Sequence, residues 1–265
     1  MATIAYHRPE SVAEAARLVA ADPDARVIAG GQSVLPAMKL GLLMPSAFID
    51  LAGLGELRGI RVDGGRVSIG AMVTHAAVAE SPEIRATLPA LCDLAEGIGD
   101  AQVRNRGTIG GSVANSDPAA DYPAAVLALN ATIRTNQRAI AADAFFKGLF
   151  ETDLKPGELI TAIEFPVPSR AAYMKFPQPA SRFALVGVFV AHTGGRVRVA
   201  VTGAAAHAFR LEALEEALAR RFVPEACDAV TVAASGLNGD LHGSAGYRAA
   251  LIPVLARRAV RRLTG

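Results

Sequence analysis

The first fifty residues combine short apolar runs with one amphipathic segment. Ser11 and Glu14 have the spacing of a capping box at the start of that segment, and Pro23 ends it. The predicted elements are strands at residues 4–6, 27–29 and 48–51 and a helix at residues 12–19. The order strand, helix, strand predicts a small parallel βαβ unit.

The pattern changes near Gly59, where alternating apolar and polar residues flank Gly64-Gly65 and predict a hairpin. A dense glycine and polar segment, expected to form loops, covers residues 97–121. The predicted elements are hairpin strands at 60–62 and 66–69, helices at 88–96 and 123–129, and strands at 131–135, 159–165 and 171–176. The last three are expected in a second, mostly antiparallel sheet.

The C-terminal third begins after Pro177-Gln178-Pro179, where we place a domain boundary. An apolar run at residues 183–191 and an alternating run at 196–201 flank Gly194-Gly195, which predicts another hairpin. From Leu211 onward apolar residues recur at helical spacing.

Composition narrows the class of protein. Apolar residues make up 51% and charged residues 20%, which excludes a disordered chain, and the net charge of +2 gives no case for nucleic acid as a partner. No apolar run spans a bilayer and no secretory leader is visible, so we expect a cytoplasmic protein. Cys92 and Cys227 are far apart and the five histidines are scattered, so we expect no metal centre in this chain.

The first candidate site is the pair Gly30-Gly31 directly after the strand at 27–29. Glycine permits backbone conformations that point successive N–H groups into one concavity, where they can hold an anion such as a phosphate. The pattern matches neither the dinucleotide motif G-x-G-x-x-G nor a P-loop. A tight turn without any ligand is the alternative.

The second candidate site is the segment 104–115, which contains Gly110-Gly111. It offers hydroxyl groups on Thr108 and Ser112, backbone N–H groups at the glycines and an amide on Asn115. Two such loops together could hold the two phosphates and the sugar of a dinucleotide. A β-bulge or a tight turn between strands is the alternative.

Asp121 follows the second glycine segment just before a predicted helix. Its carboxylate can accept hydrogen bonds from a ribose or an adenine amine. It can equally cap the helix, since aspartate is favoured at that position. The sequence leaves both roles open.

Taken together, these motifs resemble a known family. Residues 29–40 and 98–111 look like the two FAD-binding signatures of the medium subunits of molybdenum hydroxylases, the carbon monoxide dehydrogenase, xanthine dehydrogenase and aldehyde oxidase type. The resemblance continues in order along the chain, at residues 117–125, 146–151, 157–160 and 184–188.

The resemblance implies a vanillyl-alcohol-oxidase-type (PCMH-type) FAD-binding domain at residues 1–177, with subdomains at about 1–56 and 57–177. A C-terminal α+β domain at 178–265, a three-stranded sheet with helices, would follow. By the family pattern, residues 29–34 and 108–112 hold the FAD diphosphate, and Asp121 binds the adenosine half. Ile98, Ile160 and Lys175 match positions near the flavin or adenine rings. With Asn115, the predicted cofactor-binding residues are Ala29, Gly30, Gly31, Gln32, Ser33, Val34, Ile98, Thr108, Ile109, Gly110, Gly111, Ser112, Asn115, Asp121, Ile160 and Lys175.

Lys175 and a residue outside this set, Phe183, bear on the flavin end of the cofactor. A cation at Lys175 would stabilise reduced flavin, whereas a plain exposed lysine is the alternative. Phe183 departs from relatives that often carry Tyr beside the flavin, which puts a hydrogen bond to flavin there in doubt. No histidine or cysteine lies within either glycine motif, so we expect FAD to be bound non-covalently.

The family resemblance also implies partners. An iron–sulfur small subunit with [2Fe-2S] clusters and a molybdopterin large subunit would join this chain in a dimer of heterotrimers, and no catalytic residue is expected here. The cysteine-rich insertion of the benzoyl-CoA reductase branch is absent from the sequence. The rival hypotheses are a free-standing flavin oxidoreductase on the same scaffold and a non-redox binding module.

Overall fold

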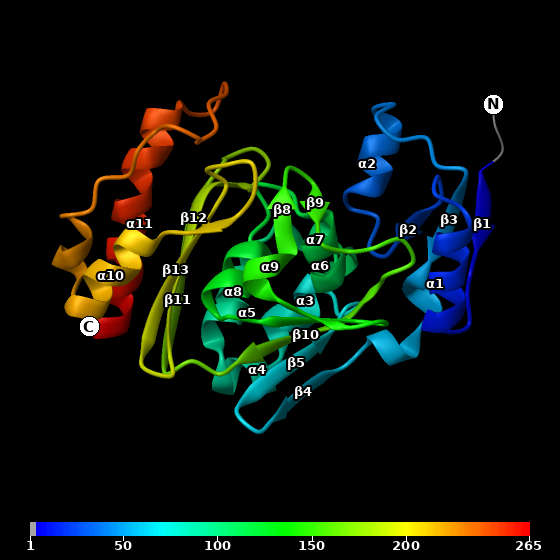
Figure 1. The fold of residues 1–265 in the computed structure, drawn as a ribbon, viewed down its shortest axis with the longest axis horizontal. Helices are drawn as coiled ribbons and strands as arrows, with labels where there is room; N and C mark the ends of the chain where they lie inside the picture. Colours follow the sequence, from blue (N-terminus) through cyan, green and yellow to red (C-terminus); the bar gives the residue numbers. More distant parts are fainter. Residues whose placement is uncertain (1–3) are drawn as a thin grey trace.

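Three blocks of secondary structure lie side by side along the long axis of the molecule (Figure 1). The computed structural model describes residues 4–265, so the first three residues, on which the expectation of no secretory leader partly rests, lie outside it. In the described part of the chain, no helix is both long enough and apolar enough to cross a membrane.

The first block is a three-stranded parallel sheet with two helices. Ser11 caps the first helix as predicted, because its Oγ accepts the N–H of Glu14 at 3.2 Å. The strand order is β1-β3-β2, so β3 lies between the two strands that the sequence predicted to be neighbours. Its elements are β1 (Ala5–His7), α1 (Val12–Ala21), β2 (Arg26–Ile28), α2 (Val34–Lys39), β3 (Ala47–Asp50) and the 3-10 turns Leu51–Gly53 and Gly55–Leu57.

The second block is a five-stranded antiparallel sheet, in the order β4-β5-β10-β6-β7, packed against short helices. The hairpin predicted around Gly64-Gly65 is confirmed, and both glycines have positive φ. The strands are β4 (Ile60–Asp63), β5 (Arg66–Gly70), β6 (Thr132–Thr135), β7 (Ala139–Ala141) and β10 (Ile160–Pro166), with a small hairpin of β8 (Phe146–Gly148) and β9 (Glu151–Thr152). The helices are α3 (His75–Glu80), α4 (Pro82–Thr87), α5 (Pro89–Glu96), α6 (Ala101–Arg106), α7 (Ile109–Asn115), α8 (Tyr122–Ala128) and α9 (Ala142–Phe145).

The glycine and polar segment 97–121 contains helices α6 and α7, so the prediction of loops there is wrong. Asp100 and Thr108 begin these helices, since each side chain accepts an N–H three residues later. Two glycines inside α7 disfavour a helix by about 1 kcal/mol each. Packing against the second block offsets that cost, because Ile109 and Gly110 are buried.

The third block is a four-stranded antiparallel sheet covered on one side by two helices (Figure 1). It has the predicted three long strands and a two-residue fourth. Its first strand pairs with β12 along its length, so the prediction that residues 171–176 join the second sheet is wrong. The elements are β11 (Arg170–Pro177), β12 (Ala184–Thr193), β13 (Arg196–Thr202), β14 (Phe209–Arg210), α10 (Glu212–Arg220), the 3-10 turn Pro224–Cys227 and α11 (Ala245–Thr264).

The third sheet contributes to two hydrophobic cores because side chains alternate between its faces. Val188 and Val190 of β12 pack with α10 and α11. Phe189 and Ala191 face the other way and belong to the main core of the second block. A smaller core beneath the first sheet includes Met72, which lies outside the first block and ties it to the second.

Candidate functional site

The first glycine pair forms a turn between β2 and α2, as predicted. Gly31 has φ +73°, a left-handed conformation that favours glycine. Within the described part of the chain, the N–H groups of residues 30–33 donate to no protein acceptor. Residues 29–31 are half-buried, and Gln32 and Ser33 are exposed. This turn therefore presents unpaired donors of the kind that bind an anion.

The second glycine pair is built differently. Thr108 is buried, and its Oγ1 accepts the N–H of Gly111 at 3.1 Å, which caps α7. The other N–H groups at this helix start donate to backbone carbonyl oxygens. Ile109 donates to Val73 at 3.0 Å, Gly110 to Ala71 at 2.9 Å and Ser112 to Thr108 at 3.0 Å. The expectation that these amides are free to hold a phosphate is therefore not met in this structure.

The two glycine motifs nevertheless meet. A Cβ atom added to Gly30 would lie 2.1 Å from the carbonyl oxygen of Arg106, so only glycine allows this backbone contact. Beside the contact is a cavity of about 110 Å³ whose lining includes two arginines; it is lined by Ala29, Ala52, Arg58, Met72, Thr74, Asn105, Arg106 and Thr108. Cations next to unpaired amides suit a diphosphate.

A buried polar network joins Asp121 to the third sheet. The hydroxyl of Tyr173 donates to Asp121 at 2.5 Å, and the ammonium group of Lys175 donates to the same carboxylate at 2.9 Å and to the carbonyl of Gly97 at 3.0 Å. Asp121 is 4% exposed and makes no capping bond to α8, so the capping alternative is wrong. The Lys175 side chain is 10% exposed, so it is not a plain surface lysine.

Burial sets the protonation behaviour of this network. It raises the pKa of Asp121, and Lys175 and Tyr173 oppose that shift. Burial together with the nearby carboxylate raises the pKa of Tyr173 well above its usual value, so the phenol keeps its proton and donates it. The sequence analysis missed Tyr173. The available signal was its position two residues before Lys175, which puts both side chains on one face of a strand.

The remaining predicted residues lie around these two features. Ile98 follows the carbonyl that binds Lys175 and packs against the main core. Ile160 is buried at the start of β10, beside a register shift, and the next residue accepts a hydrogen bond from Ala71, which in turn accepts from Gly110. Ser112 and Asn115 are half-buried on α7. Contact of these side chains with a cofactor stays a prediction.

His75 supports the second motif from behind. The backbone N–H of His75 donates to the carbonyl of Gly107 at 2.9 Å, and a Cβ added to Gly107 would lie 2.5 Å from the ring Nε2 of His75. Burial lowers the pKa of His75 to about 4, so the imidazole is neutral at pH 7. Its Nδ1 and the hydroxyl of the neighbouring Tyr122 are buried without a protein partner, a pair that suits one internal water molecule.

FAD is the cofactor that the sequence resemblance implies, and the residues fit it. The unpaired amides of residues 30–33 match a diphosphate, and Arg106 supplies positive charge at the same place. The carboxylate of Asp121 is held by a cation and a phenol rather than by its own helix. No group of three or more potential metal ligands occurs among residues 4–265.

Comparisons with known proteins agree with this assignment. The family model described as the FAD binding domain in molybdopterin dehydrogenase matches residues 2–168. The chain is 37% identical to the carbon monoxide dehydrogenase medium chain of Hydrogenophaga pseudoflava, covering 96% of this chain and 95% of that one. It is 36% identical to the nicotine 6-hydroxylase medium subunit of Paenarthrobacter nicotinovorans, covering 97% and 96%.

Solved structures show the same fold. The reconstituted CO dehydrogenase from Oligotropha carboxidovorans superposes with a TM-score of 0.91 at 35% identity, covering 98% of this chain and 97% of that one. Quinoline 2-oxidoreductase from Pseudomonas putida 86 gives a TM-score of 0.88 at 31% identity, covering 98% and 96%. The predicted FAD-binding fold with a C-terminal α+β domain is confirmed. The chain therefore belongs to the family of FAD-binding subunits of molybdopterin dehydrogenases.

Proposed function

We propose that this chain is the FAD-binding medium subunit of a molybdenum hydroxylase and serves as its electron-transfer flavoprotein. The observation that carries the proposal is the row of unpaired amides at residues 30–33, placed against Arg106 at the end of a parallel strand. These amides bind the diphosphate, and the Asp121–Lys175 pair orients the adenosine or flavin end. Bound FAD supplies a two-electron store between one-electron iron–sulfur clusters and an external acceptor.

The protein itself contributes binding and electrostatics rather than acid or base chemistry. Lys175 places a positive charge in a nearly dry site, which favours an anionic partner. Tyr173 and Asp121 fix its position. Oxidation of the organic substrate belongs to the molybdopterin subunit, so no side chain of this chain is assigned a catalytic role.

Assembly with other subunits is part of the same proposal. The curated relatives named above are a medium chain and a medium subunit, which supports a multi-subunit enzyme and disfavours a free-standing oxidoreductase. We extend this to one iron–sulfur small subunit, one molybdopterin large subunit, a dimer of such heterotrimers and a cytoplasmic location. Co-purification of the chains encoded beside this one, with size measurement, tests the arrangement.

The division of the chain into domains also stays a proposal. We divide it into an FAD-binding domain with subdomains at about 1–56 and 57–177 and a C-terminal domain at 178–265. The pairing of β11 with β12 favours moving the second boundary to about residue 168, where the family model ends.

Titration of the full chain with FAD tests the proposal directly. We expect a Kd below about 100 μM, which corresponds to roughly −5.5 kcal/mol. Gly30→Ala should weaken FAD binding at least tenfold, about 1.4 kcal/mol, because the new Cβ forces the turn away from Arg106. Gly53→Ala is the matched control, since nothing lies within 4 Å of its Cβ position. No FAD uptake, or equal affinities for both variants, would contradict the proposal.

A further inference from the structure

The cavity beside the contact of Gly30 with Arg106 lies where the turns after two neighbouring parallel strands come together. Ile28 of β2 pairs with Asp50 of β3, so the turns that begin at residues 29 and 51 leave the sheet at the same edge. Ligands commonly bind outside the carboxyl ends of parallel strands. The volume of about 110 Å³ is below the roughly 300 Å³ at which small-molecule sites begin, so the cavity holds a phosphate-sized group rather than a ring system.

The wall of this cavity offers hydrogen-bond donors and no acidic side chain among the described residues that line it. The Oγ1 of Thr74 accepts the N–H of Ala77 at 3.2 Å, and the Oγ1 of Thr108 accepts the N–H that caps α7. Neither hydroxyl proton has an acceptor among residues 4–265, although Thr108 is only 3% exposed. Unused donors on a buried wall, next to the unpaired amides of residues 30–33, indicate an anion.

Arg58 brings a positioned and unpaired positive charge to this wall. Its Nη2 donates to the carbonyl of Ala52 at 3.0 Å, and both residues line the cavity. Its backbone is also fixed, because its N–H donates to the carbonyl of Gly55 at 3.0 Å. In the described part of the chain, its Nε and Nη1 make no hydrogen bond and the guanidinium forms no ion pair. An anchored guanidinium with free N–H groups suits phosphate oxygens.

The acidic residues of the segment 50–60, which carries Arg58, are engaged elsewhere. Asp50 accepts the hydroxyl of Tyr6 at 2.5 Å and the backbone N–H two residues along the chain at 2.9 Å. Glu56 accepts the N–H of the first residue of α1 at 2.9 Å, so its carboxylate is directed at that helix. Neither carboxylate compensates Arg58, whose charge is therefore left for a ligand.

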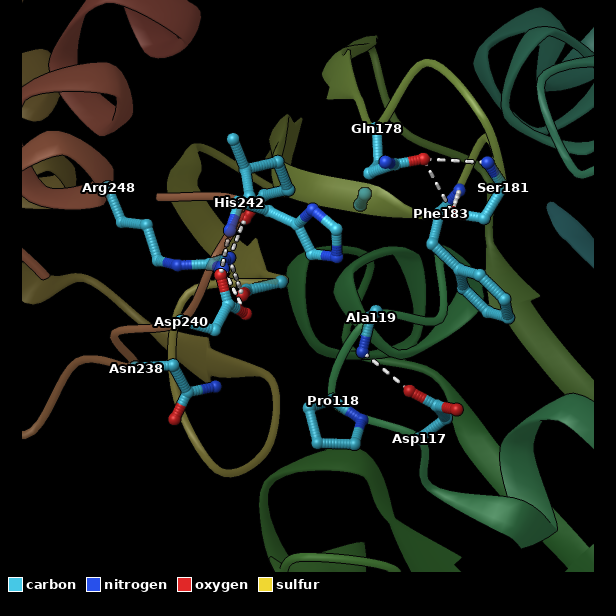
Figure 2. Close-up of a pocket in the computed structure, with 13 residues that line it drawn as sticks. Asp117, Pro118, Ala119, Gln178, Ser181, Phe183, Asn238, Asp240, His242 and Arg248 are labelled. Atoms are coloured by element: carbon cyan, nitrogen blue, oxygen red, sulfur yellow. Dashed lines mark hydrogen bonds and ion pairs between the residues drawn. The ribbon is translucent and has the colours of Figure 1, made fainter. Parts of the chain in front are cut away.

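The larger cavity of the molecule, of about 300 Å³, shows the opposite arrangement (Figure 2). Its buried arginine, Arg248, donates to Asp240 at 2.7 Å and to two backbone carbonyls, and Figure 2 shows the guanidinium directed at Asp240. Asp117 adds a second carboxylate to the lining. A phosphate would find no uncompensated guanidinium on that wall, in contrast to the cavity beside Arg58.

We propose that Arg58 makes this site select a diphosphate over a monophosphate. The amides of residues 30–33 bind one phosphate, and the guanidinium of Arg58 binds the other. A ligand with a single phosphate fills the turn and leaves Arg58 without a partner. The inference rests on the proposed function and deepens it, because it assigns a specificity-determining side chain to the phosphate end of the nucleotide.

Calorimetric titration of the full chain with ADP, AMP and FAD tests the proposal. Arg58→Gln should weaken ADP and FAD binding about tenfold and AMP binding less than twofold. Arg58→Lys keeps the charge and loses the planar guanidinium, so its ADP affinity should fall between those of the wild type and Arg58→Gln. Arg61→Gln is the matched control, since Arg61 is exposed on β4 outside the lining of this cavity, and all three affinities should stay unchanged.

A salt series separates charge from structure. The difference in ADP affinity between the wild type and Arg58→Gln should narrow as NaCl is added, because screening weakens the contribution of the charge. A difference that is independent of salt would overturn the inference, and so would equal losses for ADP and AMP in Arg58→Gln.

Two further outcomes separate this inference from the proposed function. Equal affinities of Arg58→Gln and Arg61→Gln for ADP and FAD would overturn the role of Arg58 and leave the flavoprotein assignment standing. ADP binding with the expected dependence on Arg58, but without uptake of FAD, would overturn the proposed function and support the diphosphate site. Absence of binding of both ADP and FAD to the wild type would overturn both.

Discussion

The two glycine pairs, Gly30-Gly31 and Gly110-Gly111, resemble each other in sequence and differ in what their backbones do. In the first, four consecutive amides have no acceptor among residues 4–265, and one residue adopts a left-handed conformation. In the second, the amides donate to Ala71 and Val73, in the segment just after β5, and to Thr108. The first pair is an open turn with unpaired donors, whereas the second is a packed helix start.

The difference teaches that glycine serves two separate purposes beside one site. Gly31 provides backbone freedom, because few other residues adopt its φ of +73° without strain. Gly110 provides space, since a Cβ there would lie 2.5 Å from the Cβ of Ala71 and 2.7 Å from its backbone. A substitution at Gly31 should therefore affect the ligand, and one at Gly110 should affect the fold.

Gly110→Val should produce the largest effect. We expect a loss of about 3 kcal/mol or more in the free energy of unfolding of FAD-free protein, because overpacking against a rigid backbone is costly. Chemical denaturation measures it. Unchanged stability of the variant would indicate that Gly110 serves cofactor binding rather than folding.

Low pH should also destabilise the second glycine motif, through protonation of His75. Its pKa is lowered to about 4 in the folded protein, so the neutral ring contributes stability that is present above pH 6.5 and is lost as the pH falls through 4. The loss amounts to about 3 kcal/mol. The free energy of unfolding of the wild type should fall between pH 6.5 and 4, whereas that of His75→Phe should lack this loss. A pH dependence that persists unchanged in the variant would show that other groups are responsible.

Thr108→Val should have the smallest effect of the three. It removes the cap on Gly111 and leaves that N–H unpaired, which costs about 1 kcal/mol of unfolding free energy. Thr108→Ser keeps the hydroxyl and serves as the matched control. Thermal melts of both variants would separate the cap from the methyl group. Equal loss in both would assign the effect to packing.

Local sequence patterns predicted most of the helices and strands. The hairpin glycines at 64–65 and 194–195 all have positive φ, and the alternating residues around them form the expected strands. Ser11 and Ser244 begin helices that apolar spacing also indicated. Helix α7 was missed because its glycines have low helix propensity, and burial outweighs that preference. Helix α6 contains no glycine, and its alanine, glutamine and arginines favour a helix, so its signal was present and was overlooked. The sheet to which β11 belongs was missed because strand pattern does not specify a distant partner.

The site was partly predictable for a similar reason. Asp121 and Lys175 were expected and do pair, but Tyr173 completes their network only through a fold that brings α8 against β11. The local sequence does not determine whether a backbone N–H group is free or hydrogen-bonded. That is why the sequence could not show that the amides of the second pair are bonded and those of residues 30–33 are free among the described residues.

The two-sided third sheet has a consequence for any attempt to isolate the nucleotide-binding part. Phe189, Ala191 and Ala200 fill the same hydrophobic cluster as the helices of the second block. A truncated polypeptide ending at residue 168 would lack these side chains and expose a broad apolar wall to water. We expect such a fragment to aggregate during expression, so the cofactor-binding part is not a portable module and needs its C-terminal neighbour to be soluble.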